Sequence, residues 1–234
     1  MSLFKFKQFS INQDKCAMKV GTDSILFGSW LVYNSTYKSV LDIGAGTGLL
    51  TLMIAQKWAT VNISALEINP DAYLQAKDNI IASKWADRIS VYHTDANTWK
   101  STQKFDLFIS NPPYFSNSIN SKLNSKNIAR HQVVFKLQNL IDMWEKHGTE
   151  KSELACVLPV DQAEALIKSA ISMAYFLKRQ TIVRSNEKSK SIRQLLLFSK
   201  YKAPTITSEL CIYSVDKTYT KEYIELTKDY YLGL

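Results

Sequence analysis

A strand–glycine–helix unit constrains the fold of this 234-residue chain more than any other stretch. It reads Ser39-Val-Leu-Asp-Ile-Gly-Ala-Gly-Thr-Gly-Leu-Leu50, and its apolar run 40–43 predicts a buried strand. Gly44, Gly46 and Gly48 permit a tight turn and let a ligand approach backbone N–H groups where the next helix begins. The unit therefore predicts an α/β sheet with a ligand site at this turn.

The spacing of these glycines is not that of a dinucleotide-binding loop. The pattern here is Gly-x-Gly-x-Gly, whereas the dinucleotide fingerprint is Gly-x-Gly-x-x-Gly. Asp42, two residues before Gly44, also suits a cationic ligand better than a pyrophosphate, because like charges repel. The spacing of the glycines therefore argues against a nucleotide-dependent oxidoreductase. The residues that follow the loop indicate which ligand it binds.

Acidic residues follow the next two predicted strands. The strand 62–66 ends at Glu67, where a carboxylate can accept hydrogen bonds from both hydroxyls of a ribose. A strand near 88–92 precedes Asp95 and Ala96. Asp95 is placed to bind the amino group of an adenine, although an aspartate in such a position is by itself more often a turn residue.

A fourth strand ends at two consecutive prolines. The run Phe105-Asp-Leu-Phe-Ile-Ser110 is followed directly by Asn111-Pro-Pro-Tyr114. Proline has no N–H donor and fixes φ at about −65°, so the chain leaves the sheet in a set direction. An amide side chain, a backbone carbonyl and an aromatic ring therefore gather at the carboxyl end of a strand, the edge at which α/β sheets bind ligands.

This cluster suits the transfer of a group to an exocyclic amine. The lone pair of such a nitrogen is delocalised, but two acceptors for its hydrogens favour a pyramidal nitrogen whose lone pair points at an electrophile. The side-chain oxygen of Asn111 and the carbonyl of Pro112 are suited to accept them, and Tyr114 to stack on a flat base or amide. We predict a catalytic segment of Asn111, Pro112, Pro113 and Tyr114; the alternative is a Pro-Pro turn without catalytic function.

Positive charge is concentrated in two stretches of the chain, whose formal net charge is +8. No acidic residue occurs between 107 and 141, and Glu187 is the only one between 165 and 208. Such asymmetry suggests a polyanionic partner, although a solvated basic surface gives the same pattern. Six cations in these stretches are predicted to contact RNA: Lys122, Lys126, Arg130, Lys178, Arg179 and Arg193.

The remaining composition indicates a cytoplasmic protein without a membrane span or a metal site. No stretch approaches the roughly 18 apolar residues of a membrane helix, and the N-terminus has no signal-peptide core. Cys16, Cys156 and Cys211 are far apart and show no metal-ligand spacing, so we expect reduced thiols in the core.

The chain shows no linker that would divide it, and we expect a single domain over 1–234. It comprises an N-terminal arm (1–35), a catalytic core (36–200) and a C-terminal extension (201–234). The arm either covers the domain or forms one wall of the ligand pocket, and Thr22 and Asp23 are typical of a helix N-cap.

Further elements follow in the second half of the chain. The polar stretch 116–127 is long enough to be a lid that orders on substrate. The patterns beyond it predict helices near 138–146, 161–173 and 220–230 and strands near 154–158, 178–183, 193–198 and 209–213. The strands near 178–183 and 193–198 follow each other without a helix, which predicts an antiparallel hairpin at the sheet edge.

The glycine loop, Glu67, Asp95 and Asn-Pro-Pro-Tyr, in this order, resemble the class I S-adenosylmethionine-dependent methyltransferases, in particular the branch that methylates amino groups. A finer resemblance spans the whole chain and is most specific in Cys16-Ala-Met-Lys-Val-Gly-Thr-Asp23. It is to the bacterial enzymes that N6-methylate the adenine next to the anticodon, position 37, of the valine-1 tRNA. Asn69, Ser24 and Phe27 depart from the family pattern.

The resemblance implies a Rossmann-like, seven-stranded, mostly parallel sheet with an antiparallel last strand and helices on both faces. It implies that the protein binds S-adenosyl-L-methionine and the anticodon loop of a tRNA, with Asn111 to Tyr114 holding the adenine amino group. We expect a monomer, although the sequence does not fix the oligomeric state. It assigns the cofactor to Thr22, Asp42, Gly44, Gly46, Gly48, Glu67, Asp95, Ala96 and Asn111. An adenine methyltransferase acting on rRNA or DNA, a protein glutamine methyltransferase and a non-catalytic RNA-binding module remain alternatives.

Overall fold

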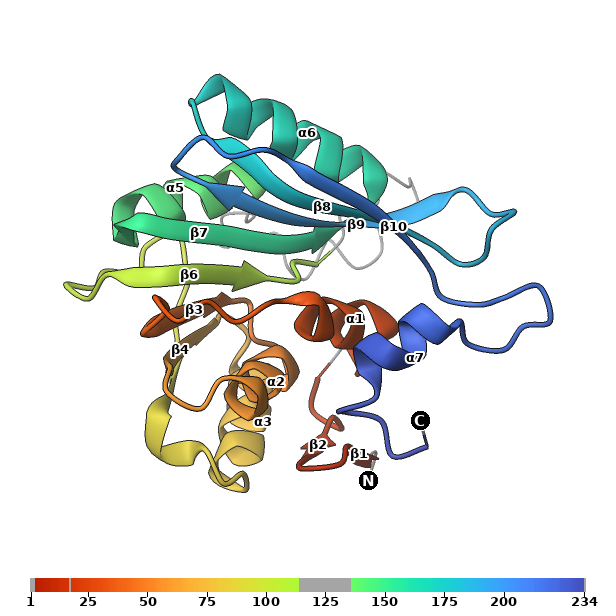
Figure 1. Ribbon diagram of the computed structural model, residues 1–234. Helices are drawn as coiled ribbons and strands as arrows, with labels where there is room; N and C mark the ends of the chain where they lie inside the picture. The colour runs from red at the N-terminus through yellow and green to blue at the C-terminus, as the bar shows by residue number, and fades with distance from the viewer. Residues whose placement is uncertain (1–2, 17, 114–135, 234) are drawn as a thin grey trace, which may run out of the picture.

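A single large sheet forms the centre of the molecule, and helices cover both of its faces (Figure 1). The computed structural model describes residues 3–16, 18–113 and 136–233. The strands of the sheet are β3 (Ser39–Ile43), β4 (Asn62–Glu67), β5 (Ile89–His93), β6 (Phe105–Ser110), β7 (Gly148–Leu158), β8 (Phe176–Arg184), β9 (Ser191–Ser199) and β10 (Ile206–Cys211). Their order is β10-β8-β9-β7-β6-β3-β4-β5, and only β9 runs antiparallel to its neighbours.

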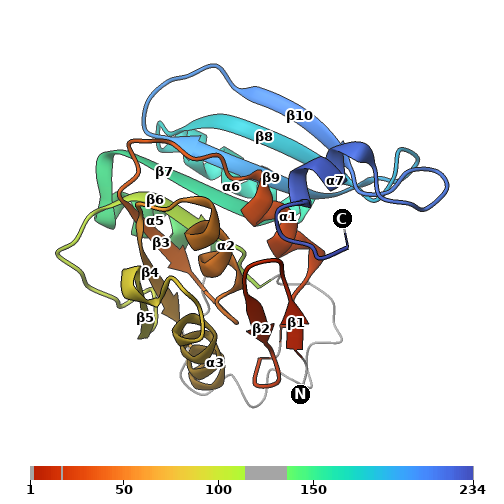
Figure 2. The same ribbon diagram turned by 60° about the horizontal axis from the view of Figure 1, so that its bottom comes forward.

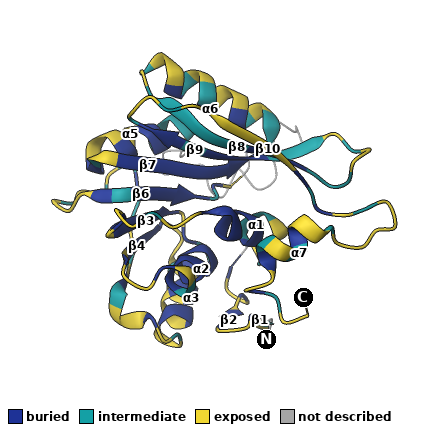
Figure 3. Ribbon diagram, viewed as in Figure 1, coloured by how far each residue is buried: buried dark blue, intermediate teal, exposed yellow. Residues whose placement is uncertain are grey.

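Two hydrophobic cores lie between the sheet and its helices. The helices are α1 (Thr22–Trp30), α2 (Leu49–Lys57), α3 (Pro70–Ile81), α5 (Leu137–His147), α6 (Val160–Ser172) and α7 (Lys221–Thr227), with a short 3-10 turn at Ala86–Arg88. Side chains of β7 alternate between the two cores, as the pleat of a strand requires. Leu154 and Cys156 pack towards α5 and α6, whereas Ala155 and Val157 pack towards α1 and α2. The central strands are buried on both faces (Figure 3), which is typical of a parallel sheet.

The predicted α/β class is confirmed, but the sheet has eight strands where seven were expected. The antiparallel β8–β9 hairpin is confirmed, yet it is not at the sheet edge, because β10 pairs in parallel with β8. The strand expected near 209–213 overlaps β10, which begins three residues earlier, at Ile206. The first four residues of β10 are exposed, so this part of the strand lacks the apolar alternation that identifies a strand. Because β10 pairs with β8, the backbone groups of β8 do not form a long open edge of the sheet (Figure 3).

The N-terminal arm is a hairpin of β1 (Leu3–Lys5) and β2 (Ser10–Asn12) that lies beside the end of the chain (Figure 2). The backbone N–H of Lys7 donates to the carbonyl of Tyr230 at 2.9 Å. The amide of Asn79 in α3 donates to the carbonyls of both Asn12 and Thr47 at 2.9 Å. The arm is therefore tied to the glycine loop as well as to the C-terminus.

The pair Asn69-Pro70 predicts a helix N-cap with proline at the first helical position. This cap and the one expected at Thr22 and Asp23 have different outcomes. Asn69 caps α3 as expected, since its side-chain oxygen accepts from the N–H groups of Asp71 and Ala72 at 3.0 Å. The cap expected at Thr22 and Asp23 is wrong, because α1 begins at Thr22 and its N-cap residue is Gly21, which has no side chain to donate or accept. No helix in the described parts of the chain combines the length and apolarity that crossing a membrane needs.

We expect Asn69→Ala to lower the free energy of unfolding by about 1 kcal/mol, because two N–H groups at the start of α3 lose their acceptor. Urea unfolding monitored by circular dichroism measures this loss. Asn69→Ser is the matched control, since a serine hydroxyl accepts the same hydrogen bonds. An alanine variant as stable as the wild type would show that the cap contributes nothing to the fold.

Candidate active site

The glycine loop and the Asn-Pro-Pro segment meet at one edge of the sheet. β3 and β6 are parallel neighbours, so their carboxyl ends lie side by side. The hydroxyl of Ser110, the last residue of β6, donates to the carbonyl of Ile43, the last residue of β3, at 2.7 Å. A cavity opens at this point, lined by Met18, Lys19, Val20, Ser24, Asp42, Gly44, Ala45, Gly46, Thr47, Leu49, Leu50 and Asn111.

The three glycines of the loop have two different roles. All have positive φ, at 80°, 57° and 80° for Gly44, Gly46 and Gly48, which L side chains rarely adopt. A Cβ on Gly44 or Gly46 would meet no atom within 4 Å, so the backbone at these two positions is open to a ligand. A Cβ on Gly48 would lie 3.4 Å from the Cβ of Ala76, so this glycine allows α2 to pack on α3.

Glu67 holds the loop in place. Its carboxylate is buried and accepts from the N–H of Gly46 and the N–H of Asn69, each at 2.8 Å. The carbonyl of Leu66 adds two more bonds, from the N–H groups of Gly44 and Ala45 at 2.9 and 3.0 Å. A carboxylate has about four lone-pair positions, so both oxygens of Glu67 retain capacity for a ligand hydroxyl.

Asp42 places a buried carboxyl group against the cavity. It is 1% exposed, and its Oδ2 accepts from the hydroxyl of Thr51 at 2.6 Å. Its Oδ1 is buried and has no hydrogen-bond partner among the described residues. Burial raises the pKa of Asp42 to about 7, with a further contribution from the charge of Glu67. An unpartnered acceptor of this kind fits a cationic group in the cavity.

Asn111 is oriented by the start of α1. Its amide nitrogen donates to the hydroxyl of Ser24 at 2.7 Å, which fixes the direction of the amide. Next to Ser24, the carboxylate of Asp23 accepts from Nε of Arg193 in β9 at 2.8 Å. Asn111 is half-buried, Pro112 is buried and Pro113 is exposed. Three distant segments of the chain therefore converge on the end of β6.

Four predicted site residues lie outside the described residues, namely Tyr114, Lys122, Lys126 and Arg130, together with the expected lid at 116–127. Their roles stay predictions.

Five residues predicted to bind the cofactor are not among those that line the cavity. Two of them, Gly48 and Glu67, support the glycine loop, and the other three lie elsewhere. Thr22 is exposed at the start of α1. Asp95 forms a turn, in which its Oδ1 accepts from the N–H of Asn97 at 2.8 Å. Ala96 is buried in the core beneath α5 and α6. Their contact with a cofactor stays a prediction.

The three described cations that were predicted to contact RNA have partners within the protein. Lys178 pairs with the buried Glu153 at 2.6 Å, and Arg193 pairs with Asp23. The guanidinium of Arg179 lies 3.7 Å from the ring centroid of Trp30 and donates to its carbonyl at 2.7 Å. Burial lowers the pKa of Arg179 to about 10. The structure gives each cation a structural role, and RNA contact stays a prediction for all three.

Several residues that line the cavity were not predicted as site residues, including Met18, Lys19 and Ser24. Met18 and Lys19 belong to the block 16–23, which carried the most specific part of the resemblance and supports the interpretation of the arm as one wall of the pocket. Ser24 follows this block directly. Within the described ranges, no cluster of three His, Cys, Asp or Glu residues is arranged to hold a metal ion.

The sheet is doubly wound, a glycine loop follows its first strand, and a cavity opens at the carboxyl ends of its strands. Together with the strand order, these features define a class I methyltransferase fold. Comparison with solved structures agrees. The crystal structure of a predicted O-methyltransferase from Agrobacterium tumefaciens superposes with a TM-score of 0.69 at 16% identity, covering 89% of this chain and 96% of that one.

Sequence comparison gives the family. The model for the methyltransferase small domain matches residues 16–134. Two relatives carry the name tRNA1(Val) (adenine(37)-N6)-methyltransferase: one from Flavobacterium psychrophilum, 38% identical over 99% of this chain and 100% of its own length, and one from Haemophilus influenzae, 42% identical over 99% of both. The chain belongs to the methyltransferase small domain family and, within it, to the family of these two relatives.

We expect the affinity for S-adenosylmethionine to rise with pH, because the buried carboxyl group of Asp42 ionises as pH rises. This ligand carries a cationic sulfonium and a cationic amine. An aspartate in an unfolded chain has a pKa of about 3.9, whereas the pKa of Asp42 in the folded protein is about 7. Because the cation favours the ionised carboxylate, the Kd should fall about tenfold from pH 6 to pH 8. Titration calorimetry at the two pH values measures this change.

The same shift has the opposite effect on the stability of the protein alone. Protonation of Asp42 stabilises the folded state below a pH of about 4, and this contribution is lost as pH rises through about 7.

The variant Asp42→Asn tests the role of this carboxylate in binding. It should bind S-adenosylmethionine more weakly than the wild type and without the pH dependence. An equally steep pH dependence in this variant would show that another group titrates.

Proposed function

We propose that this protein transfers the methyl group of S-adenosyl-L-methionine to N6 of adenine-37 in tRNA1(Val). The relatives that bear this activity in their names are 38–42% identical over nearly the full chain. The structural observation that carries the proposal is the amide of Asn111, oriented by Ser24 at the end of β6 and placed beside the glycine loop. A substrate base in this cavity would therefore meet an oriented amide next to the cofactor loop.

The glycine loop and the acidic residues beside it fit the proposed cofactor. Gly44 and Gly46 present open backbone, Asp42 presents a buried acceptor to a cation, and Glu67 has capacity for the ribose hydroxyls. Gly48 supports the loop from behind, while Thr22, Asp95 and Ala96 are assigned to the cofactor by resemblance alone. When bound, S-adenosylmethionine supplies a methyl group that its sulfonium makes electrophilic.

Asn111 and Pro112 supply the chemistry that an adenine amine needs. The side-chain oxygen of Asn111 and the carbonyl of Pro112 each accept one hydrogen of N6, which fixes the nitrogen and directs its lone pair out of the plane of the base. In the transfer, the bond between N6 and the methyl group would form as the bond between that methyl group and sulfur breaks, and the positive charge would pass to N6, where the same two acceptors stabilise it. N6 would then lose one of its two hydrogens to water as a proton. The hydrogen bond to Ser24 keeps the amide of Asn111 in the orientation that this requires.

The substrate reaches this cavity only as an unstacked base. Adenine-37 lies in the anticodon loop, where bases can be splayed out at a modest cost, and Tyr114 is proposed to stack on the extruded base. We further propose that the enzyme works in the cytoplasm, where tRNA is modified, and as a monomer. The mechanism uses no metal ion.

Asn111→Ala should lower kcat by about 100- to 1000-fold, because both the placement of N6 and the stabilisation of its charge are lost. The Kd for S-adenosylmethionine should change little, since Asn111 contributes only part of the cavity wall. Ser24→Ala should reduce kcat by a smaller factor, because it removes the orienting hydroxyl but keeps the acceptor. Loss of cofactor binding in Asn111→Ala at unchanged kcat would overturn the catalytic role of Asn111.

The substrate is tested by methyl transfer from labelled S-adenosylmethionine to unmodified tRNA, followed by nucleoside analysis. The proposal predicts label in N6-methyladenosine of the tRNA1(Val) transcript. A transcript with guanine at position 37 is the matched control and should remain unlabelled. Label that appears in rRNA, in DNA or on a protein glutamine, with none in tRNA, would overturn the substrate while leaving the cofactor assignment intact.

A further inference from the structure

A groove beyond the cavity lies between two turns at the same edge of the sheet. β8 is antiparallel to β9, which is antiparallel to β7, so β8 runs parallel to β7 and ends at the edge that carries Asn111. The turn after β8 and the loop after β10 both project there (Figure 1). Between them is a groove of about 440 Å³ lined by Asn186, Glu187, Lys188, Tyr213, Ser214, Val215 and Lys217, which we call the tyrosine groove.

A column of three tyrosine rings runs from the core to this groove. Tyr223 is buried in α7 and stacks on Tyr219 with ring centroids 4.7 Å apart and planes inclined by 20°. Tyr219 stacks on Tyr213 at 5.1 Å and 18°. Tyr213 and Tyr219 are each 37% exposed, and Tyr213, the last ring of the column, lines the groove. A flat group in the groove can therefore extend an existing stack.

The loop that carries Tyr213 and Tyr219 is held in its conformation by its own hydrogen bonds. The N–H of Ser214 donates to the carbonyl of Thr218 at 2.9 Å, and the hydroxyl of Thr218 donates to the carboxylate of Asp216 at 2.8 Å. The N–H of Tyr213 donates to the carbonyl of Ser185 at 2.8 Å, which joins the two turns. A ligand would thus bind a preformed surface at little cost in ordering.

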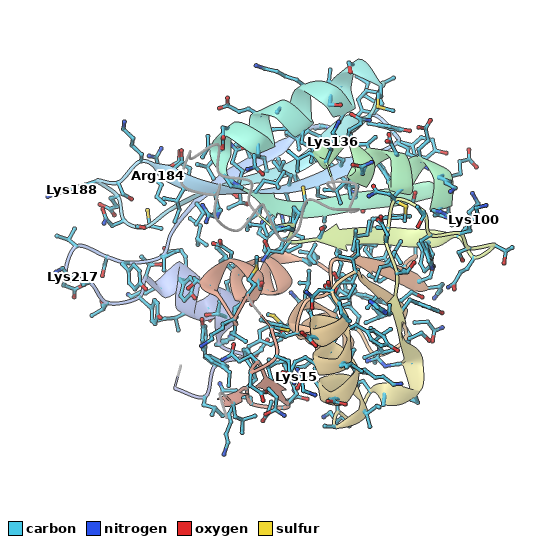
Figure 4. All side chains as sticks on the ribbon, turned by 180° about the vertical axis from the view of Figure 1, so that it is seen from behind. Lys15, Lys100, Lys136, Arg184, Lys188 and Lys217 are labelled. Atoms are coloured by element: carbon cyan, nitrogen blue, oxygen red, sulfur yellow. The ribbon has the colours of Figure 1, made fainter. Side chains whose placement is uncertain are left out.

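The charges around the groove favour an anion. The side chains of Lys188 and Lys217 extend from the two turns on the same side of the molecule, near Arg184 (Figure 4). Glu187 is the one acidic residue among those that line the groove. Of the neighbouring acids, Asp216 accepts hydrogen bonds within its own turn and Glu209 pairs with Arg184 at 3.3 Å. Two lysines therefore face one carboxylate, beside an exposed aromatic face.

We propose that the tyrosine groove binds a single-stranded segment of the RNA substrate, with one base stacked on Tyr213 and the flanking phosphates near Lys188 and Lys217. An exposed aromatic face with adjacent cations is how proteins hold unpaired nucleotides, because every base has a π face and every linkage carries a charge. This inference rests on the proposed function, since it places more of the RNA whose adenine enters the cavity at the end of β6.

Tyr213→Ala should raise the Kd for the tRNA about tenfold, which corresponds to the loss of one stacked base. Tyr213→Phe keeps the ring and should bind as the wild type does. Tyr201→Ala is the matched control, because Tyr201 is 46% exposed but follows the end of β9, at the opposite edge of the sheet. Fluorescence anisotropy with labelled tRNA at fixed salt measures all four proteins.

Lys188→Ala and Lys217→Ala should each reduce the slope of log Kd against log salt by about 1, as the loss of one phosphate contact does. Lys100→Ala serves as the control, because Lys100 lies on the opposite side of the molecule (Figure 4). These lysine variants test the groove independently if removal of Tyr213 unfolds the loop, which a thermal melt of each variant detects.

The outcomes separate this inference from the proposed function. For the groove variants, kcat at saturating tRNA and the Kd for S-adenosylmethionine should equal the wild-type values. If the wild type methylates tRNA while the groove variants bind it with wild-type affinity and salt slope, the groove inference is overturned and the function stands. If the wild type neither binds nor methylates tRNA, the proposed function fails first, and the groove inference fails with it.

Discussion

The site depends on the hydrogen bond between Ser110 and Ile43, because it joins the carboxyl ends of β3 and β6. One of these strands leads into the glycine loop and the other into Asn-Pro-Pro, so the spacing of the two strand ends sets the distance between these two segments. Asn111 is then tied to α1 through Ser24, and α1 is tied to β9 through the Asp23–Arg193 ion pair. Segments from three parts of the sequence thus share one rigid edge.

The electrostatics of the same edge are set by burial. Asp42 sits at the end of a strand that is buried along its whole length, and desolvation disfavours its charged form. Such a carboxylate carries its full charge at neutral pH only when a cation compensates it. Binding of a positively charged ligand here would therefore be coupled to ionisation of Asp42, whereas the neighbouring Glu67 accepts two backbone hydrogen bonds and holds the loop.

Local signals in the sequence predicted the parts of the structure that local interactions determine. The glycine turn, the Asn69 cap and the β8–β9 hairpin each follow from a few adjacent residues. The start of β10 and its pairing with β8 were not predicted, because its first residues are exposed and carry no apolar pattern and because strand pairing joins residues far apart in sequence. Ser24 was not predicted to lie in the site, because its contact with Asn111 crosses 87 residues. The partners of Lys178, Arg179 and Arg193 are likewise distant in sequence, so a count of charges does not reveal them.

In the proposed mechanism, Asn111 and Pro112 hold the amino group of the substrate adenine opposite the cofactor. A crystal structure of the protein with S-adenosylhomocysteine and the anticodon arm of tRNA1(Val) tests it most directly. We expect N6 of adenine-37 within hydrogen-bonding distance of both the Asn111 side-chain oxygen and the Pro112 carbonyl, with the amide still bonded to Ser24. An adenine whose N6 contacts neither oxygen, or a cofactor bound away from Asp42 and the glycine loop, would contradict it.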